Sequence, residues 1–445
     1  NGLPKTWMLW CSWFSRRGSS TNLLFSPCDG PRHVESEIVL LRVKGGKPLL
    51  EFVNRNLLLL FGCQMVFVSG NILLVTVGGI VGYQLAPDPA FATLPVALMV
   101  IGTACATVPA AFTMQRFGRK YGFILATGIA ALGAWLATRA LAGQSFWLFC
   151  AATACVGSSL GFSQQFRFAA AESVPLHRVS HAVSFILLGS IAGAFLGPAV
   201  VSYSADANPL NPYSLAFQIV IALYFFAAVL LLGLRDMQVV HEVDAAVAGE
   251  RPADGLFARP AFVTAVLAGV LGQGVMTYVM TATPISMNVD NGFSLQTTSE
   301  VVRAHVIAMY LPSLITPWLV SRLGLPRMML LGVVTLGVTI IIGMGGHHLM
   351  HYWFCMVLLG VGWNFLFVAG TSMLVQTYRP EERFRAQAIN DFSVFGASAL
   401  ASLLAGTVLF EFGWLTLMVS VIPSLLVMLA TLAWLRRSQQ AAAPA

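Results

Sequence analysis

The sequence predicts an all-α polytopic membrane protein with twelve transmembrane helices in two six-helix, pseudo-symmetric bundles. Of its 445 residues, 57% are hydrophobic and only 10% are charged, which lies outside the range of soluble domains. Apolar stretches long enough to cross a hydrocarbon core of about 30 Å as helices recur along the chain. Two basic turns, at Arg116 and Arg322, lie 206 positions apart, and each is flanked by such stretches. The chain is therefore predicted to consist of two similar halves that form an internal repeat.

The predicted helices fall into two sets of six. The first set lies at about 56–84, 92–113, 121–142, 146–171, 181–203 and 214–234. The second set lies at about 259–287, 300–320, 328–346, 352–376, 385–410 and 413–435. Residues 51–235 and 259–437 are predicted to form the two bundles, with a tail at 438–445. Residues 236–258 contain the one long polar connection and are predicted to be a cytoplasmic linker.

Residues 1–50 show no sustained helical or strand period and carry seven cations against three acids. They are predicted to form a poorly ordered cytoplasmic extension without transport chemistry. The compact apolar segment of a cleavable signal peptide is not visible in them. Because the sequence begins at Asn1, this extension is interpreted as the start of a fragment or as extra sequence ahead of the natural start.

The distribution of Lys and Arg predicts the orientation in the membrane, because cytoplasmic loops retain cations during insertion. If the first helix runs outward, fourteen basic residues of the loops and the C-terminal tail fall inside. Only Arg139 and Arg303 then fall outside. Both termini of this multi-pass chain are therefore predicted to be cytoplasmic.

The composition argues against several classes of function. The net charge of +7 comes from cations scattered over short loops, so nucleic acid is not an expected partner. The seven cysteines show no CxxC spacing, and the outer-loop histidines His347, His348 and His351 have no carboxylate or thiol beside them. Neither a metal site nor a cofactor is expected. The sequence has no G-x-x-x-x-G-K-[ST] phosphate loop, which argues against direct drive by ATP.

The first basic turn carries a specific motif. Gln115-Arg116-Phe117-Gly118-Arg119-Lys120 resembles the signature G-x-x-x-D-R-x-G-R-[KR] between the second and third helices of the major facilitator superfamily. The matching positions are Arg116, Gly118, Arg119 and Lys120. The family's leading glycine is Ala111 here and its aspartate is Gln115, which weakens the charge relay of this loop. The second turn repeats a basic residue and a glycine at Arg322 and Gly324.

This resemblance implies the superfamily fold over residues of about 56–436, with two halves that rock about a central site. Gly193–Pro198 in the fifth helix resembles part of the family's antiporter signature G-x-x-x-G-P. Three further strings, Phe166–Glu172, His305–Pro312 and Asn390–Phe392, resemble a bacterial branch of the superfamily that includes riboflavin-type transporters. The antiporter pattern favours export, whereas the branch favours uptake of a vitamin or metabolite.

Ionisable residues inside the predicted helices are functional candidates, because a charge at mid-helix costs roughly 2.5 to 3.5 kcal/mol on insertion scales. Arg167 and Asp391 lie near the cytoplasmic ends of the fourth and eleventh helices, where the resemblance implies an inner gate. The alternative is that Arg167 reaches the headgroups and Asp391 caps its helix. Glu172 is expected to partner the basic loop. His305 is a candidate proton acceptor or a packing residue.

Neutral polar residues at mid-helix need a partner or a wet cavity. Asn71, Gln273 and Asn364 lie close to the midpoints of the first, seventh and tenth helices, which line the central cavity in the superfamily. Gln164 and Gln165 lie nearer the cytoplasm. With Tyr278 and Trp363 as a stacking wall for a planar ligand, these residues form the predicted substrate site. The alternative is helix-to-helix hydrogen bonding and ordinary core packing.

Taken together, these patterns predict a secondary active transporter, not an enzyme. It would move a small organic solute across the bacterial inner membrane by alternating access, coupled to protons. Two directions stay open, namely proton-driven export of a drug or metabolite and import of a flavin-like vitamin. A membrane-embedded enzyme is a remote alternative, because no His or carboxylate pair lies at useful spacing within any predicted helix. A channel or receptor-like binding protein is the other.

Overall fold

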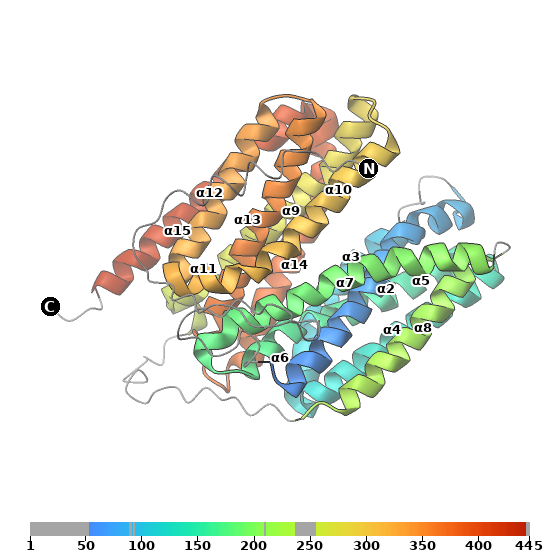
Figure 1. Ribbon diagram of the computed structural model, residues 1–445, viewed down its shortest axis with the longest axis horizontal. Helices are drawn as coiled ribbons and strands as arrows, with labels where there is room; N and C mark the ends of the chain where they lie inside the picture. Colours follow the sequence, from blue (N-terminus) through green and yellow to red (C-terminus); the bar gives the residue numbers. More distant parts are fainter. Residues whose placement is uncertain (1–52, 89–90, 92–93, 209–210, 236–254, 442–445) are drawn as a thin grey trace, which may run out of the picture. The chain divides into compact units, whose positions relative to one another are not determined.

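The computed structural model describes residues 53–88, 91, 94–208, 211–235 and 255–441. The extension at 1–50 lies outside the described residues, as does most of the predicted linker, since only 255–258 of it are described. Leu50–Ala445 forms one compact unit. Figure 1 shows its helices in two groups, coloured blue to green in the first half of the chain and yellow to red in the second.

The first half forms six crossings. Their helices are α2 (Arg55–Leu85), α3 (Leu94–Phe117), α4 (Arg119–Ala142), α5 (Phe146–Ser163) with α6 (Phe166–Glu172), α7 (Val179–Ala207) and α8 (Pro212–Leu232). A single 3-10 turn (Leu176–Arg178) precedes α7. The helices α5 and α6 belong to one crossing, Phe146–Glu172, which is interrupted only at Gln164 and Gln165.

The second half contains α9 (Pro260–Ile285), α10 (Leu295–Tyr310), α11 (Thr316–Leu323), α12 (Leu325–Met344), α13 (Leu349–Val375), α14 (Arg383–Val419) and α15 (Ile422–Ala441). Short segments adjoin them, namely 3-10 turns at Leu256–Ala258 and Leu311–Leu314 and a π-helical turn at Ser286–Asp290. Within this half α13 is the most enclosed crossing, since 78% of its apolar window is buried. Polar side chains on α13 therefore need partners inside the protein.

The described residues contain the twelve crossings that the sequence predicts. Ten stretches pass as membrane spans by length and composition, and Gln296–Leu314 with Thr316–Leu323 makes an eleventh. The stretch Arg383–Ala441 is 59 residues long, although about 20 residues suffice to cross a bilayer. Its backbone leaves helical geometry at Gly413, where φ is 77°. This stretch therefore crosses twice.

The predicted eighth helix, a continuous segment at 300–320, is wrong in detail. The chain forms α10, then the 3-10 turn Leu311–Leu314, then α11, with a bend of 53°. Pro312 lies in that turn and Pro317 opens α11. Proline has no N–H to donate and its ring crowds the preceding turn. Two prolines five residues apart therefore interrupt the helix.

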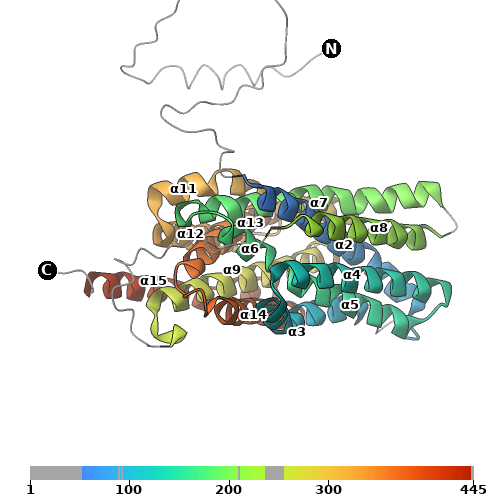
Figure 2. The ribbon, with the colours of Figure 1, turned by 90° about the horizontal axis from the view of Figure 1, so that it is seen from below.

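The internal repeat appears in the packing of the two halves. In the first half α2 packs on α7, α3 on α5 and α4 on α5; in the second half the corresponding pairs are α9 on α14, α10 on α13 and α12 on α13. The halves meet where α3 contacts α14 and α7 contacts α10 and α11. Figure 2 shows α14 beside α3.

The two basic turns have the same backbone geometry. Gly118 has φ 84° and ψ 162°, and Gly324 has φ 79° and ψ 162°. Positive φ disfavours residues with a side chain, so glycine is required at both turns although a Cβ would meet no atom there within 4 Å. The shared conformation lets the chain reverse its direction at each turn, between two antiparallel helices.

Three glycines of α7 allow its backbone to lie directly against α2. An added Cβ would lie 2.9 Å from the carbonyl oxygen of Phe61 at Gly189, 2.6 Å from that of Met65 at Gly193 and 2.8 Å from that of Ser69 at Gly197. Small residues are typical of close helix contacts in membranes. The spacing of these glycines at every fourth residue therefore allows α7 to pack closely against α2.

We expect Gly193→Ala to lower the melting temperature of the detergent-purified protein, because the methyl group would force α7 away from Met65. Overpacking of this kind costs about 1–3 kcal/mol. Gly128→Ala on α4 is the matched control, since its Cβ would meet nothing within 4 Å and alanine favours helix. Equal melting temperatures for the two variants would contradict the close α2–α7 contact.

Candidate functional site

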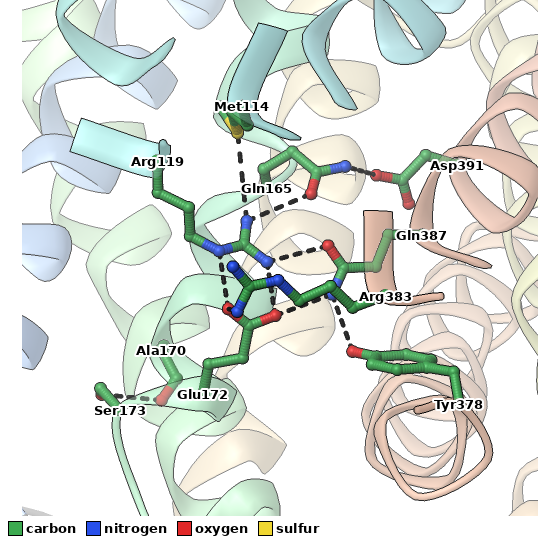
Figure 3. Close-up of polar contacts among 10 residues, drawn as sticks. All are labelled: Met114, Arg119, Gln165, Ala170, Glu172, Ser173, Tyr378, Arg383, Gln387 and Asp391. Carbon is green, nitrogen blue, oxygen red and sulfur yellow. Dashed lines mark hydrogen bonds and ion pairs between the residues drawn. The ribbon is translucent and has the colours of Figure 1, made fainter. Parts of the chain in front are cut away.

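A buried ion pair lies where the first basic turn meets the end of α6. Arg119 donates from Nε to Glu172 Oε2 at 2.7 Å and from Nη2 to Glu172 Oε1 at 2.6 Å (Figure 3). The two side chains are 4% and 1% exposed. The planar guanidinium matches the carboxylate with two parallel bonds. The prediction that Glu172 partners the basic loop agrees with this geometry.

This pair is joined to the second bundle through α14. Arg119 Nη2 also donates to Gln387 Oε1 at 2.9 Å, and Gln387 Nε2 donates to Glu172 Oε1 at 3.0 Å. The Gln387 amide makes a further bond of 2.7 Å to Tyr378. Arg383 Nη1 lies 3.7 Å from Glu172 Oε2. Glu172 thus receives cations from both halves of the chain (Figure 3).

A second ion pair lies deeper and also crosses between the bundles. Arg167 of α6 donates from Nη2 to Asp391 Oδ1 of α14. The other carboxylate oxygen, Oδ2, accepts a hydrogen bond of 2.9 Å from Gln165 Nε2. Asn390 Nδ2 donates to Oδ1 at 3.0 Å. Gln165 Oε1 accepts from Arg119 Nη1 at 3.3 Å. Gln165 therefore links the two ion pairs into one network, which we call the basic-end network.

Arg167 is less completely satisfied than Asp391. Its side chain is 4% exposed, and its Nε and Nη1 atoms are buried without a hydrogen-bond partner among the described residues. Two aromatic rings flank the guanidinium, with centroids 4.7 Å away for Phe168 and 4.4 Å away for Phe367. Aromatic faces attract a cation most strongly when it is desolvated. These rings replace part of the missing solvation.

The other residues of the two basic turns lie outside this network. Gln115 and Arg116 are exposed, and Lys120 Nζ donates to the carbonyl of Leu232 at 2.8 Å. Arg322 lies over the ring of Trp318 at 5.8 Å. Within the signature loop, Arg119 is the residue whose side chain forms a hydrogen bond with the second bundle, among the described residues. Gln115 therefore does not take the place of the family's aspartate in the network.

Four residues of these contacts are absent from the sites predicted from the sequence, namely Gln387, Arg383, Tyr378 and Phe367. Gln387 lies four residues before Asp391, and residues four apart share one face of a helix. That spacing could have placed Gln387 beside the predicted gate. Phe367 lies four residues after Trp363 on α13, so the same argument could have placed it one turn below the predicted stacking wall.

A cluster of aromatic rings lies at the level of the predicted substrate site. Trp363 Nε1 donates to Gln273 Oε1 at 2.7 Å. The Trp363 ring stacks on Phe367, with centroids 4.7 Å apart, and meets Tyr310 edge-on at 5.8 Å. We call these residues, Gln273, Tyr310, Trp363 and Phe367, the midplane cluster.

Other predicted substrate residues have different surroundings. Asn71 and Gln164 are half-buried and make no side-chain hydrogen bond within the described part of the chain, so both amides are free. Gln165 is fully buried in the basic-end network instead. The Tyr278 hydroxyl lies 3.0 Å from Ser420 Oγ, which directs it toward the last crossing and not toward Trp363. Tyr278 is therefore not part of the midplane cluster.

Asn364 requires a correction. Its side chain has no exposed surface, and its amide bonds to Thr316, Ser313 and the carbonyl of Met309 at 2.7–2.8 Å. These partners belong to the broken eighth crossing, whose non-helical turn has polar groups to satisfy. The structure therefore favours the alternative of helix-to-helix hydrogen bonding for Asn364.

His305 also lies within the second bundle, away from the basic-end network. Its Nδ1 is 2.7 Å from the carbonyl oxygen of Met356, and since a carbonyl only accepts, Nδ1 carries the proton. The Nε2 atom is buried without a partner among the described residues. This contact between α10 and α13 favours the packing role over proton coupling.

The sequence profile of the Major Facilitator Superfamily matches residues 59–284 and 264–444. The chain belongs to this superfamily. It is 34% identical over 391 residues to the riboflavin transporter RfnT of Brucella anthropi, covering 88% of this chain and 98% of that one. It is 30% identical over 357 residues to the uncharacterized MFS-type transporter YdeG of Bacillus subtilis, covering 77% and 83%.

Solved structures show the same fold at low identity. FucP, a superfamily transporter in the outward conformation, superposes with a TM-score of 0.67 at 15% identity, covering 85% of this chain and 98% of FucP. The human organic anion transporter MFSD10 gives a TM-score of 0.68 at 15% identity, covering 85% and 99%. The chain is thus a multi-pass membrane transporter with the superfamily fold, and the predicted resemblance is confirmed.

We expect Glu172→Gln to destabilise the protein strongly, because it leaves Arg119 buried without its counter-ion. Removing one partner of a buried pair costs about 3–5 kcal/mol. The matched control is Glu382→Gln, whose carboxylate pairs with Arg259 at 2.7 Å and is 29% exposed; exposed pairs contribute about 0–1 kcal/mol. Similar melting temperatures for the two purified variants would show that the buried pair is not a principal stabilising contact.

The Glu382 pair also has a predicted dependence on pH. The hydrogen bond from Arg259 lowers the pKa of Glu382 below its ordinary value. A lowered folded-state pKa stabilises the protein above the unfolded-state pKa, and this contribution disappears as pH falls through the folded-state pKa. The difference in melting temperature between wild type and Glu382→Gln should therefore be full at pH 7, begin to shrink as the pH falls below about 4.3, the ordinary pKa of Glu, and disappear as the pH falls through the lower folded-state pKa. A difference that grew on acidification would contradict this.

Proposed function

We propose that the protein is a secondary active transporter that carries a small organic solute across the bacterial inner membrane by alternating access. The observation that supports this most directly is the basic-end network. The Arg167–Asp391 pair joins the halves of the chain directly, and Gln387 and Arg383 of α14 join the Arg119–Glu172 pair to the second half. These contacts lie at the end that carries the basic turns, which the positive-inside rule assigns to the cytoplasm along with both termini. That end can open only if the network separates.

The energetics of the network suit a two-state gate. On closure the charges of Arg167 and Asp391 lose water, and their mutual attraction largely offsets that cost. On opening they lose each other and regain water. The net bias toward the closed state is therefore a few kcal/mol at most, which a solute with a preference for one state can overcome.

Protons are the proposed coupling ion, with Asp391 as the titrating group. Protonation would neutralise the carboxylate and leave Arg167 as a buried cation without a counter-ion. That arrangement is unfavourable in a dry interior, so protonation would favour separation of the bundles. Glu172 is a weaker candidate, because two arginines and Gln387 hold its carboxylate.

The proposed substrate is riboflavin or a closely related planar heteroaromatic solute, and the proposed direction is import. The similarity to the riboflavin transporter RfnT supports this choice. The midplane cluster supports it independently, since it places two aromatic rings, buried Trp363 and half-buried Tyr310, near the Gln273 amide nitrogen. That nitrogen has no partner among the described residues and could donate to a ring carbonyl. Asn71 and Gln164 supply two more free amides. Export of a drug or metabolite is the alternative, supported by the Gly193–Pro198 pattern.

Transport by purified protein in liposomes tests this function. We expect saturable riboflavin uptake that is accelerated by an imposed proton gradient, acid outside. Saturation together with gradient dependence would separate a carrier from a channel or a binding protein. If riboflavin is neither bound nor moved while another solute is extruded against the gradient, the exporter alternative replaces this proposal.

We expect Gln273→Ala to weaken riboflavin affinity by about tenfold, the loss of one good hydrogen bond. Quenching of flavin fluorescence on titration with protein measures this. Gln144→Ala, at an exposed position between α4 and α5, is the matched control and should bind like wild type. A wild-type dissociation constant for Gln273→Ala would remove Gln273 from the site.

We expect Asp391→Asn to abolish acceleration by the proton gradient while riboflavin binding stays within about threefold of wild type. Asparagine keeps the shape of the side chain but cannot exchange a proton. Gradient-driven uptake and solute counterflow are measured on the same liposomes. Uptake requires proton coupling, whereas counterflow requires only that the protein still moves the solute across the membrane. Retention of full acceleration by the gradient would rule out Asp391 as the coupling group.

A further inference from the structure

The ring of Phe367 contacts both Trp363 of the midplane cluster and Arg167 of the deeper ion pair. One side of it is stacked on Trp363, with centroids 4.7 Å apart and planes 22° from parallel. The guanidinium carbon of Arg167 lies 4.4 Å from its centroid. Phe367 is 6% exposed. A continuous line of contacts therefore runs from Gln273 through Trp363 and Phe367 to Arg167.

This line crosses from one bundle to the other at its last step. Phe367, Trp363 and Gln273 belong to α13 and α9, whereas Arg167 belongs to α6. Phe168 also flanks Arg167, at 4.7 Å, but it is the next residue on the same helix and stays with Arg167 when the bundles move. Of the two rings, only Phe367 loses its contact with Arg167 when the basic end opens.

The dependence of Arg167 on these rings follows from its hydrogen bonding. Only Nη2 is bonded, to Asp391, and Nε and Nη1 have no partner among the described residues. A buried guanidinium with two unbonded nitrogens gains much of its remaining stabilisation from aromatic faces. Small movements of the Phe367 ring therefore change how well Arg167 is held at Asp391.

We propose that Phe367 is a positioning residue that couples the midplane cluster to the gate. Its ring holds Arg167 at Asp391 while the basic end is closed. A planar solute that stacks on Trp363 or takes over the hydrogen bond of Gln273 shifts Trp363, and with it Phe367, and thereby loosens Arg167. The solute-dependent step rests on the proposed function, whereas the contact between Phe367 and Arg167 does not.

Distances between spin labels test the coupling in the full-length protein. Labels at His177 and Glu381, both exposed and on opposite bundles at the basic end, would report its opening in a background whose native cysteines are replaced by alanine. Without solute, Phe367→Leu is expected to raise the ratio of open to closed protein by about tenfold, because leucine offers no aromatic face. Phe367→Tyr keeps the face and should restore the wild-type ratio.

Phe168→Leu is the matched control for the loss of a ring beside Arg167. Because Phe168 stays with Arg167 in both states, its replacement should change the ratio by less than twofold. Melting temperatures of all variants verify folding. Equal ratios for wild type and Phe367→Leu would overturn the proposal, as would the same shift in Phe168→Leu, because either result removes the special role of the contact between bundles.

The same samples with riboflavin test the second half of the coupling. In wild type, saturating riboflavin should shift the distance distribution. Phe367→Leu is compared at a riboflavin concentration raised until fluorescence quenching shows the same occupancy, and its shift should be at least threefold smaller. An equal shift in both proteins would overturn transmission through Phe367. If riboflavin does not bind wild type, the proposed substrate is wrong, and the solute-free ratios still decide whether Phe367 positions Arg167.

Discussion

The structure depends on one electrostatic constraint, that a charge buried in a membrane protein needs a counter-charge within reach. Glu172 and Asp391 lie on opposite bundles, and each is paired with an arginine of the other bundle. Glu172 also has Arg119 within its own bundle, whereas the ion pair of Asp391 among the described residues is with Arg167 of the opposite bundle. Closing the basic end therefore satisfies both halves at once, and the specificity of closure follows from charge pairing and not from apolar contact, which lipid would satisfy equally well.

The way this chain meets the constraint differs from the signature it resembles. The signature has an aspartate at the position of Gln115, and Gln115 is exposed here. The link to the second bundle runs instead from Arg119 through Glu172 to Arg383, with Gln387 bonded to both members of the first pair. Arg119 therefore reaches the second bundle through Gln387 and Glu172, without a contribution from the side chain at position 115.

The fold was predictable because membrane insertion leaves a strong record in sequence. Long apolar stretches, basic turns and the 206-residue repeat all reflect local physical requirements, and twelve crossings follow from them. Length and hydropathy alone do not predict the break in the eighth crossing. Pro312 and Pro317 do predict it, because proline interrupts a helix. The candidate site was harder to predict, because position along a helix does not say which way a side chain points. The Asn364 amide is directed to Met309, Ser313 and Thr316, at the interrupted part of the eighth crossing. The position of a residue along its helix can be predicted from the sequence. The direction of its side chain depends on which neighbouring helix has polar groups that need a hydrogen-bond partner.

The incomplete satisfaction of Arg167 has a consequence for the balance between states. Each oxygen of Glu172 and Asp391 accepts at least one hydrogen bond, but two nitrogens of Arg167 have none among the described residues. A fully bonded arginine would hold the bundles together more tightly, and a transporter whose closed state is too stable cannot turn over. Contact with aromatic rings stabilises a cation without fixing it in one geometry. Phe367 provides such a face and also adjoins Trp363. Under the proposed function, the strength of closure would therefore depend on residues of the proposed solute site, which would link binding and closure in both directions.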